Sequence, residues 1–253
     1  MTALLVLQGV ELRFGGLQAL SDVGFAVAAG EVVAVIGPNG AGKTSLFNVI
    51  TGYAGSADGS ILLDGARIEG LTPHAIAALG VRRTFQNGGL FGALTVLENV
   101  LCSRHAAIGG GVLATLLRFP GIARRERDAA QDAHRLLEAM HVGHLAGLLA
   151  RELSGGQQRI VEIVRAIAPT PKLLLLDEPA VGLSPVARAD LATIIRQMAG
   201  QGVGVLLIEH AIELVMSVSD RIVVLSEGRV IANGTPGEVR GDRQVMEAYL
   251  GHG

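Results

Sequence analysis

The chain has 253 residues, of which 49% are hydrophobic, and its formal net charge is −2. This length suffices for one large domain or two small ones with a substantial core, and the small negative charge argues against a broad nucleic-acid-binding surface. The longest uncharged stretches, such as Ala106–Leu117 and Gln197–Ile208, are shorter than the roughly 20 apolar residues of a transmembrane helix. The single cysteine, Cys102, cannot form an internal disulfide, which fits a reducing compartment, and the first residues lack the features of a signal peptide.

The first third of the chain predicts short strands around a glycine-rich loop. Its apolar runs are Leu4–Leu7, Phe25–Val27, Val32–Ile36, Ile61–Leu63 and Ala66–Ile68. The last two runs flank Asp64-Gly65, a dipeptide that is typical of a two-residue hairpin turn. We therefore expect an antiparallel element beside a buried strand that leads directly into the loop at Gly37.

The middle of the chain, from about residue 88 to residue 166, has helical patterning, and its polar segment Arg124–Met140 is typical of a surface helix. Breaks between helices are expected at Gly109-Gly110-Gly111 and at Phe119-Pro120-Gly121. This part is therefore predicted to be a helical insert.

The last third returns to strands. Lys172–Leu176 and Val203–Ile208 are continuous apolar runs, as expected for a parallel sheet that is covered on both faces. A helix is predicted to begin at Ser184-Pro185, where a capping residue precedes a proline. Near the end, Glu227-Gly228 predicts a second hairpin, so the whole chain reads as a parallel α/β core interrupted by the helical insert.

A phosphate-binding loop is predicted directly after the strand Val32–Ile36. The segment GPNGAGKT matches the pattern G-x-x-x-x-G-K-[ST] between a strand and a helix, and its glycines let backbone N–H groups curl around phosphate oxygens. Lys43 is expected to reach the terminal phosphates and the Thr44 hydroxyl to bind Mg²⁺; the alternative is a chance glycine turn. The expected nucleotide-binding residues are Gly37, Pro38, Asn39, Gly40, Ala41, Gly42, Lys43, Thr44 and Ser45.

Two adjacent carboxylates follow the apolar run Leu173–Leu176. A strand that ends in an acid is expected to place Asp177 at the sheet edge next to the phosphate loop, where it can hold Mg²⁺. Glu178 is a candidate general base that deprotonates the attacking water, an effect worth about 10²–10⁴-fold in rate. The alternative is a plain strand end before a turn marked by Pro179, and the phosphate loop favours the catalytic interpretation.

Two further polar residues follow apolar segments. His210 comes after Val203–Ile208, so it is expected at the same sheet edge, within reach of a γ-phosphate. Gln86, in the segment RRTFQN, is a candidate residue for contact with Mg²⁺ or with water. Taken alone, a single histidine is more often structural and Gln86 is a loop glutamine.

The segment LSGGQQR at Leu153–Arg159 predicts a helix start that binds an anion. Ser154 and Gln157 match the capping box S-x-x-[EQ]. Apolar residues follow at helical spacing: Ile160, Ile163, Val164 and Ile167. Because Gly155 and Gly156 leave the backbone N–H groups of the first turn accessible, this helix end is suited to an anion.

Taken in order, GPNGAGKT, FQN, LSGGQQR, LLLLDEP, GLS and IEH resemble the motifs of the ATP-binding-cassette (ABC) ATPases over essentially the whole chain. The resemblance implies an α/β fold with a P-loop NTPase (RecA-like) core, an antiparallel β subdomain and an inserted helical subdomain. It implies a single nucleotide-binding domain over residues 1–253. Core and β subdomain would occupy 1–87 and 167–236, the helical subdomain 88–166, and a C-terminal tail 237–253.

The resemblance also answers which anion the LSGGQQR segment faces. In this family two cassettes stack head to tail, and each signature helix caps the ATP held by the other phosphate loop. Ser154, Gly155, Gly156 and Gln157 would therefore contact a nucleotide bound by the partner, so that ATP closes the dimer and hydrolysis releases it.

Further roles are implied for single residues by the same resemblance. Phe14 would stack on adenine, where most members have tyrosine, although a core phenylalanine is the alternative. Gln86 would sense the transporter, Glu178 would be the base and His210 the switch histidine. Ser184 stands where the family usually has aspartate or asparagine.

Segments such as TFQNGGLFGALTVLENVL are similar to the ATP-binding subunits of bacterial branched-chain amino acid importers, and the helical insert resembles the larger of their two ATPase subunits. The chain has LSGG where that subunit commonly has LSYG. This resemblance implies ATP and Mg²⁺ as cofactors, and as partners a second ABC ATPase subunit and two transmembrane permease subunits, bound through the region near Leu90–Leu101. A periplasmic or lipid-anchored solute-binding protein would act indirectly, and the location would be peripheral, on the cytoplasmic face of the bacterial inner membrane.

Three alternatives accompany this interpretation. Importers of urea or amides have near-identical cassettes. A non-transport ABC ATPase acting on DNA or ribosomes predicts tandem cassettes, a coiled-coil insert or a basic surface, and the sequence has none of these. A phosphate-loop kinase or a plain nucleotide-binding module does not require the LSGGQQR segment, and it predicts ATP turnover without dimerisation.

Overall fold

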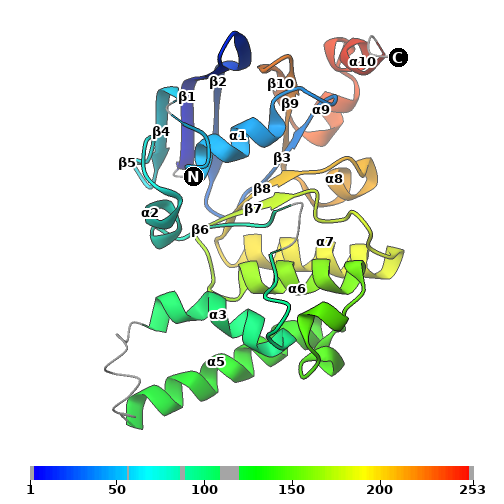
Figure 1. The fold of residues 1–253 in the computed structure, drawn as a ribbon. Coiled ribbons are helices and arrows are strands. Elements are labelled where there is room, and N and C mark those ends of the chain that lie inside the picture. Colours follow the sequence, from blue (N-terminus) through cyan, green and yellow to red (C-terminus); the bar gives the residue numbers. More distant parts are fainter. Residues whose placement is uncertain (1–2, 56, 86–88, 109–119, 251–253) are drawn as a thin grey trace. The chain divides into compact units, whose positions relative to one another are not determined.

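The structure is a computed structural model that describes residues 3–55, 57–85, 89–108 and 120–250 (Figure 1). The chain divides into two compact units. Unit 1 comprises Met1–Arg83, Lys172–Pro179 and Ala192–Gly253, and unit 2 comprises Thr84–Pro171 and Ala180–Leu191. The residues of the predicted helical subdomain, 88–166, belong to unit 2. The predicted break at Gly109-Gly110-Gly111 lies outside the described residues.

Unit 1 contains a four-stranded sheet of order β2-β1-β4-β5 and a six-stranded sheet of order β10-β9-β3-β8-β7-β6. The strands of the first are β1 (Ala3–Phe14), β2 (Leu17–Ala28), β4 (Asp58–Leu63) and β5 (Ala66–Arg67). Those of the second are β3 (Val32–Ile36), β6 (Val81–Arg83), β7 (Leu173–Asp177), β8 (Gly204–Ile208), β9 (Arg221–Ser226) and β10 (Arg229–Gly234). Five strands of the second sheet run parallel and only β10 is antiparallel, which confirms the predicted parallel core.

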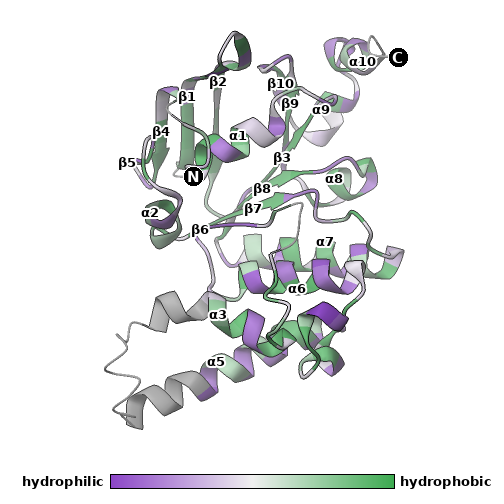
Figure 2. Cartoon of the chain, viewed as in Figure 1, coloured by the Kyte–Doolittle hydropathy of each residue, from purple (hydrophilic) through white to green (hydrophobic). Residues whose placement is uncertain are grey.

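Helices cover both faces of the six-stranded sheet in unit 1. They are α1 (Lys43–Ile50), α2 (Pro73–Ala78), α8 (Ile212–Val218), α9 (Pro236–Arg240) and α10 (Arg243–Leu250). Successive residues of β3 point to opposite faces: Val33 and Val35 join the core shared with α1 and the four-stranded sheet, and Ala34 and Ile36 join the core shared with α8, α9 and α10. This burial on both sides explains why β3 is hydrophobic along its length (Figure 2). β7 before Asp177 and β8 are likewise buried and largely hydrophobic (Figure 2).

Unit 2 is mainly helical. Its helices are α3 (Val96–Ile108), α5 (Pro120–Ala139), α6 (Gly155–Ile167) and the short 3-10 turns η1 (Gly143–Leu145) and η2 (Ala150–Glu152), and α7 (Pro185–Gly200) begins in unit 2 and ends in unit 1. Ser184 caps α7, because its Oγ accepts a hydrogen bond from the backbone N–H of Ala187 at 3.2 Å. Among the helices that the structure describes, none combines the length and the apolar character of a membrane span.

Both predicted hairpin turns are confirmed. Asp64 and Gly65 have φ angles of 53° and 77°, and Glu227 and Gly228 have φ angles of 48° and 75°. Positive φ at both central positions is the conformation of a type I′ turn. The local sequence therefore determined both turns.

The first two strands are much longer than the sequence predicts. The runs Leu4–Leu7 and Phe25–Val27 lie inside β1 and β2, which have 12 residues each. The pairing of these strands shifts register at several points, for example between Leu7 and Val10, and such bulges break the alternation on which the prediction depends. Periodicity also fails to predict β6, α2, α8, α9 and α10, since elements of 3 to 8 residues contain too few repeats.

Candidate functional site

Glycines shape the phosphate loop between β3 and α1. Gly37, Gly40 and Gly42 have φ angles of 152°, 81° and 99°, which residues with a Cβ atom rarely adopt. A Cβ atom on Gly37 would lie 2.0 Å from the carbonyl oxygen of Leu225, and one on Gly42 would lie 2.6 Å from that of Ala19. The loop therefore keeps this path only with glycine at these two positions.

Lys43, the first residue of α1, turns back into this loop. Its Nζ donates hydrogen bonds to the carbonyl oxygens of Gly37 at 2.7 Å and Pro38 at 2.9 Å. Burial lowers the pKa of the Lys43 ammonium group from its ordinary value, and the carboxylates of Glu178 and Asp177 oppose that shift. Both predicted carboxylates thus lie close enough to influence the charge inside the loop.

Asp177 is the last residue of β7 and is almost completely buried, with 1% of its surface exposed. Its Oδ2 accepts a hydrogen bond from Nη2 of Arg83 at 2.9 Å. Local sequence gives no signal for a role of Arg83, because β6 is only three residues long. The structure therefore adds a buried cation to the predicted site.

Glu178 has a strained backbone and a histidine partner. Its φ angle of 48° is uncommon for a residue with a side chain, and such outliers cluster at functional sites. Its backbone N–H donates to the carbonyl oxygen of Ile208 at 2.8 Å, which ties Glu178 to the end of β8. Nε2 of His210 lies 3.0 Å from Oε1 of Glu178. The two predicted catalytic residues, 32 positions apart, are therefore in direct contact.

A hollow of about 300 Å³, called the loop hollow here, lies over the phosphate loop. It is lined by Phe14, Leu17, Gln18, Ala19, the loop residues Asn39–Ser45, Glu178 and His210. Phe14 is 52% exposed, so the alternative that it is a core phenylalanine is wrong. No sequence pattern predicts that the start of β2 lines this hollow. The β1–β2 hairpin brings Leu17, Gln18 and Ala19 there.

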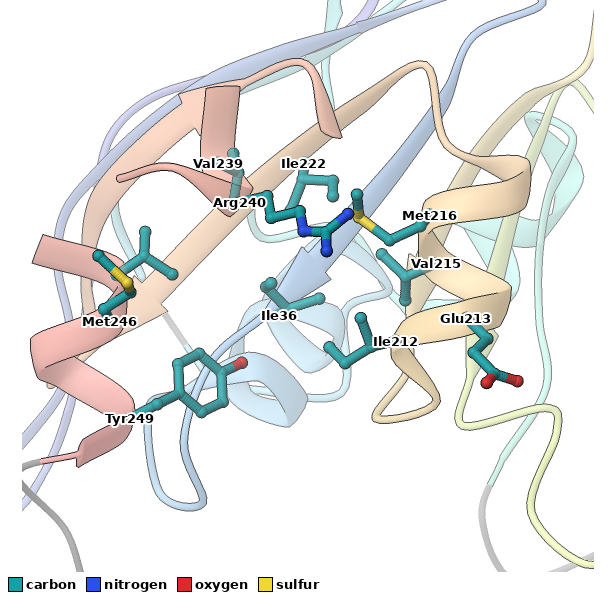
Figure 3. A pocket seen from close by; sticks show the side chains of 11 residues that line it. Ile36, Ile212, Glu213, Val215, Met216, Ile222, Val239, Arg240, Met246 and Tyr249 are labelled. Carbon is teal, nitrogen blue, oxygen red and sulfur yellow. The ribbon is translucent and has the colours of Figure 1, made fainter. Parts of the chain in front are cut away.

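A second hollow of about 600 Å³, called the apolar groove here, lies in unit 1 between α8 and α10 (Figure 3). Most of its lining is apolar, and the side chain of Arg240 extends over it, whereas the carboxylate of Glu213 points away (Figure 3). Burial raises the pKa of Tyr249 at one end, and a hydrogen bond from the backbone of Gly37 opposes this shift. Among the described residues that line the groove, no acid is paired with a base.

The signature segment caps α6 in unit 2 as predicted. The backbone N–H of Ser154 donates to Oε1 of Gln157 at 2.9 Å, and the backbone N–H of Gln157 donates to Oγ of Ser154 at 3.4 Å. Ser154 and Gly155 are exposed, and Gly156 and Gln157 are partly exposed. The first turn of α6 therefore presents backbone N–H groups at the surface of unit 2, as an anion site requires.

Gln86 lies outside the described residues. The two described residues that flank positions 86–88 are Phe85 and Gly89, and both are hydrogen-bonded to side chains of α6. Nη1 of Arg159 donates to the carbonyl oxygen of Phe85 at 2.6 Å, and Oε1 of Glu162 accepts a hydrogen bond from the backbone N–H of Gly89 at 2.9 Å. Arg159 and Glu162 are buried and also pair with each other at 3.1 Å. The helix that carries the signature segment thus anchors both ends of the segment that contains Gln86.

The donor set fits a magnesium ion that arrives with nucleotide. Within the described ranges there is no group of three or more His, Cys, Asp or Glu residues that could enclose a metal. The Thr44 hydroxyl and the Asp177 carboxylate are oxygen donors, which Mg²⁺ takes together with water and substrate phosphates.

Comparisons with known proteins show which family the chain resembles. The family model "ABC transporter" matches residues 20–181, and the model "Branched-chain amino acid ATP-binding cassette transporter" matches residues 229–253. The chain is 45% identical to the high-affinity branched-chain amino acid transport ATP-binding protein BraF of Pseudomonas aeruginosa and 41% identical to LivG of Escherichia coli, in each case over 98% of both chains. It is 34% identical over the same share to the lipopolysaccharide export system ATP-binding protein LptB of Escherichia coli.

A solved ATP-binding cassette of an ABC transporter in its ADP conformation is 33% identical to the chain, with a TM-score of 0.83 over 99% of this chain and 100% of the other. This match confirms the predicted fold type, with a nucleotide-binding α/β core. The chain therefore belongs to the ABC transporter family, as one of its ATP-binding ATPase cassettes.

Proposed function

We propose that this chain is the ATP-hydrolysing subunit of an importer for branched-chain or other hydrophobic amino acids. The observation that carries the proposal is the 45% identity to BraF, a branched-chain amino acid transport ATP-binding protein, over 98% of both chains. The match of the branched-chain family model at residues 229–253 supports it. The export protein LptB is less similar over the same length, at 34%.

ATP would bind in the loop hollow. The backbone N–H groups of Asn39–Ser45 would surround the phosphates, and Lys43 would exchange its bonds with the carbonyl oxygens of Gly37 and Pro38 for phosphate oxygens. The exposed ring of Phe14, which lines the same hollow, would stack on adenine.

Hydrolysis would depend on Glu178 and His210. Glu178 lines the hollow and would accept a proton from the attacking water. Because His210 lies 3.0 Å from Glu178, it would fix the direction of that carboxylate. His210 also lines the loop hollow, from which it would contact the γ-phosphate. Thr44, Asp177 and Gln86 would hold a Mg²⁺ ion, which neutralises phosphate charge when bound.

The complete site would require a second cassette. Ser154, Gly155, Gly156 and Gln157 would contribute the exposed helix start of α6 to ATP held by the partner's phosphate loop. Two permease subunits would bind the helical insert near Leu90–Leu101 at the cytoplasmic face of the bacterial inner membrane, and a solute-binding protein would deliver the substrate to them. The segment around Gln86, anchored by Arg159 and Glu162, would report permease state to the signature helix.

Uptake and co-purification test this proposal together. In cells that lack the chain, we expect uptake of labelled leucine, isoleucine and valine to fall to background and to return with the native chain but not with Lys43→Ala. From gently solubilised membranes we expect two multi-span permeases and a second cassette to co-purify. If cells that lack the chain lose only the uptake of urea, the transported solute belongs to the urea and amide class. If ribosomal or DNA-repair proteins co-purify with the chain in place of permeases, the proposed role in transport is rejected.

A further inference from the structure

A buried arginine lies beside the candidate magnesium ligand and has no part in the mechanism above. Arg83 ends β6, and only 5% of its side chain is exposed. A guanidinium ion removed from water to this extent is costly unless every side of it is satisfied. The hydrogen-bond partners of the Arg83 guanidinium therefore indicate the role of this side chain.

The Arg83 guanidinium is fixed from three sides. Nη2 donates to Oδ2 of Asp177 at 2.9 Å, and Nη1 donates to Oδ1 of Asn48 at 2.8 Å and to Oγ1 of Thr51 at 3.1 Å. Its central carbon lies 5.4 Å from the centroid of the Phe47 ring, within the range of a cation–π contact. Because the planar fork of arginine donates in set directions, this arrangement leaves the Asp177 carboxylate little freedom to rotate.

These contacts join the two elements that carry the candidate magnesium ligands. Asp177 ends β7, and Phe47, Asn48 and Thr51 belong to α1 or its C-terminal cap. The same helix carries Thr44 in its first turn. Arg83 therefore fixes the position of the Asp177 carboxylate relative to α1, the helix that carries the other predicted ligand, Thr44.

We propose that Arg83 is a positioning residue that holds the Asp177 carboxylate in the orientation that accepts nucleotide-bound Mg²⁺. The inference rests on the proposed ATPase function. Residues that orient a metal ligand through a hydrogen bond change metal affinity by about 10–100-fold when they are replaced. If the ion pair had a purely structural role, replacing Arg83 would lower the stability of the protein and leave its metal affinity unchanged.

Three variants separate these roles. Arg83→Met removes the charge and both hydrogen-bond directions but keeps an apolar chain over Phe47. Arg83→Lys keeps the charge and loses the planar fork. Arg82→Met is the matched control, because the neighbouring Arg82 lies on the same strand and donates to the backbone carbonyl oxygens of Ala77 and Val81.

The experiment measures two affinities on each purified, folded variant. Mn²⁺ serves as the probe, and its binding in the presence of a non-hydrolysable ATP analogue is followed by electron paramagnetic resonance. Binding of the same analogue is then measured in EDTA, without metal. For Arg83→Met we expect Mn²⁺ affinity to fall about tenfold or more, for Arg83→Lys about threefold, and for both a metal-free nucleotide affinity within about twofold of the native value.

Two outcomes would overturn the proposal: Mn²⁺ affinity within twofold of the native value in Arg83→Met, or an equal loss of metal-free nucleotide binding. If Arg83→Met does not fold, Arg83→Lys decides the question by the same two measurements. Arg82→Met is expected to leave both affinities unchanged. A native chain that binds neither the analogue nor Mn²⁺ would reject the proposed ATPase function itself, which is a different result from failure of the Arg83 variants.

Discussion

The loop hollow and the apolar groove are each lined in part by residues at or shortly after the end of β3, yet they differ in size and in the chemistry of their linings. Ile36, the last residue of β3, lines the groove, and Gly37 begins the phosphate loop. The groove is the larger of the two, about 600 Å³ against about 300 Å³. Of these two hollows, as lined by the residues that the structure describes, the loop hollow is the one that combines a cation, a carboxylate and a histidine around backbone N–H groups. Convergent polar groups, and not volume, therefore single out the loop hollow as the candidate reacting site.

The difference has a structural origin. The loop hollow lies where parallel strands end, so that polar residues directly after β3, β7 and β8 meet there. The apolar groove lies where the short helices α8, α9 and α10 pack against one face of the same sheet and present the apolar residues that this packing requires. Substitutions in the two hollows are therefore expected to have very different effects.

The largest effect is expected from Lys43→Ala in the loop hollow. It removes the cation that would donate to nucleotide phosphates, and two charge-assisted hydrogen bonds of about 1.5 kcal/mol each correspond to a loss of affinity of about 100-fold or more. Fluorescence titration with a labelled ATP measures the affinity, and circular dichroism checks the fold. Retained tight binding would contradict the assignment of the phosphate loop.

Glu178→Gln tests the catalytic role of a second residue of the loop hollow. The amide keeps the shape of the side chain and cannot accept the proton, so we expect hydrolysis to fall by about 10²–10⁴-fold while ATP binding persists. If the exposed start of α6 caps a partner's nucleotide, ATP and Mg²⁺ then trap a dimer, which size-exclusion chromatography with light scattering detects. A variant that stays monomeric under these conditions would contradict the role proposed for Ser154 and its glycines.

The smallest effect is expected from Met246→Ser in the apolar groove. Met246 is 50% exposed, so the change in the free energy of unfolding is expected to stay within about 0.5 kcal/mol. ATP affinity and the rate of hydrolysis are expected to remain within about twofold of the native values. A larger change in hydrolysis would show that the groove is coupled to the phosphate loop, through contacts such as that of Tyr249 with Gly37.

Several features of the site could be read directly from local sequence. The phosphate loop, the Ser154 and Ser184 caps and both type I′ turns are each determined by a few consecutive residues, because glycine, proline and capping side chains restrict the backbone where they stand. The apolar runs before Asp177 and His210 also predicted that these residues end or follow parallel strands, which the sheet confirms.

Other features depended on residues that are distant in sequence. Arg83 and Asp177 are 94 positions apart, and Glu178 and His210 are 32 apart. Phe14 is exposed and lines the loop hollow because it stands at the end of the long β1–β2 hairpin. The bulges of this hairpin interrupt the alternation of apolar and polar residues, so its length could not be predicted from periodicity. The apolar groove likewise arises from three helices too short to be predicted.

By itself the sequence determined the path of the glycine-rich loop, which carboxylate ends a strand, and where several helices and turns begin, because these are properties of the backbone over a few residues. Only the tertiary structure decided which side chains share a hollow, which cation faces Asp177, and which histidine faces Glu178. The physical reason is that hydrogen bonds and ion pairs act over about 3 Å. Such distances between remote residues are fixed by the packing of the core and by strand order, which no local pattern encodes.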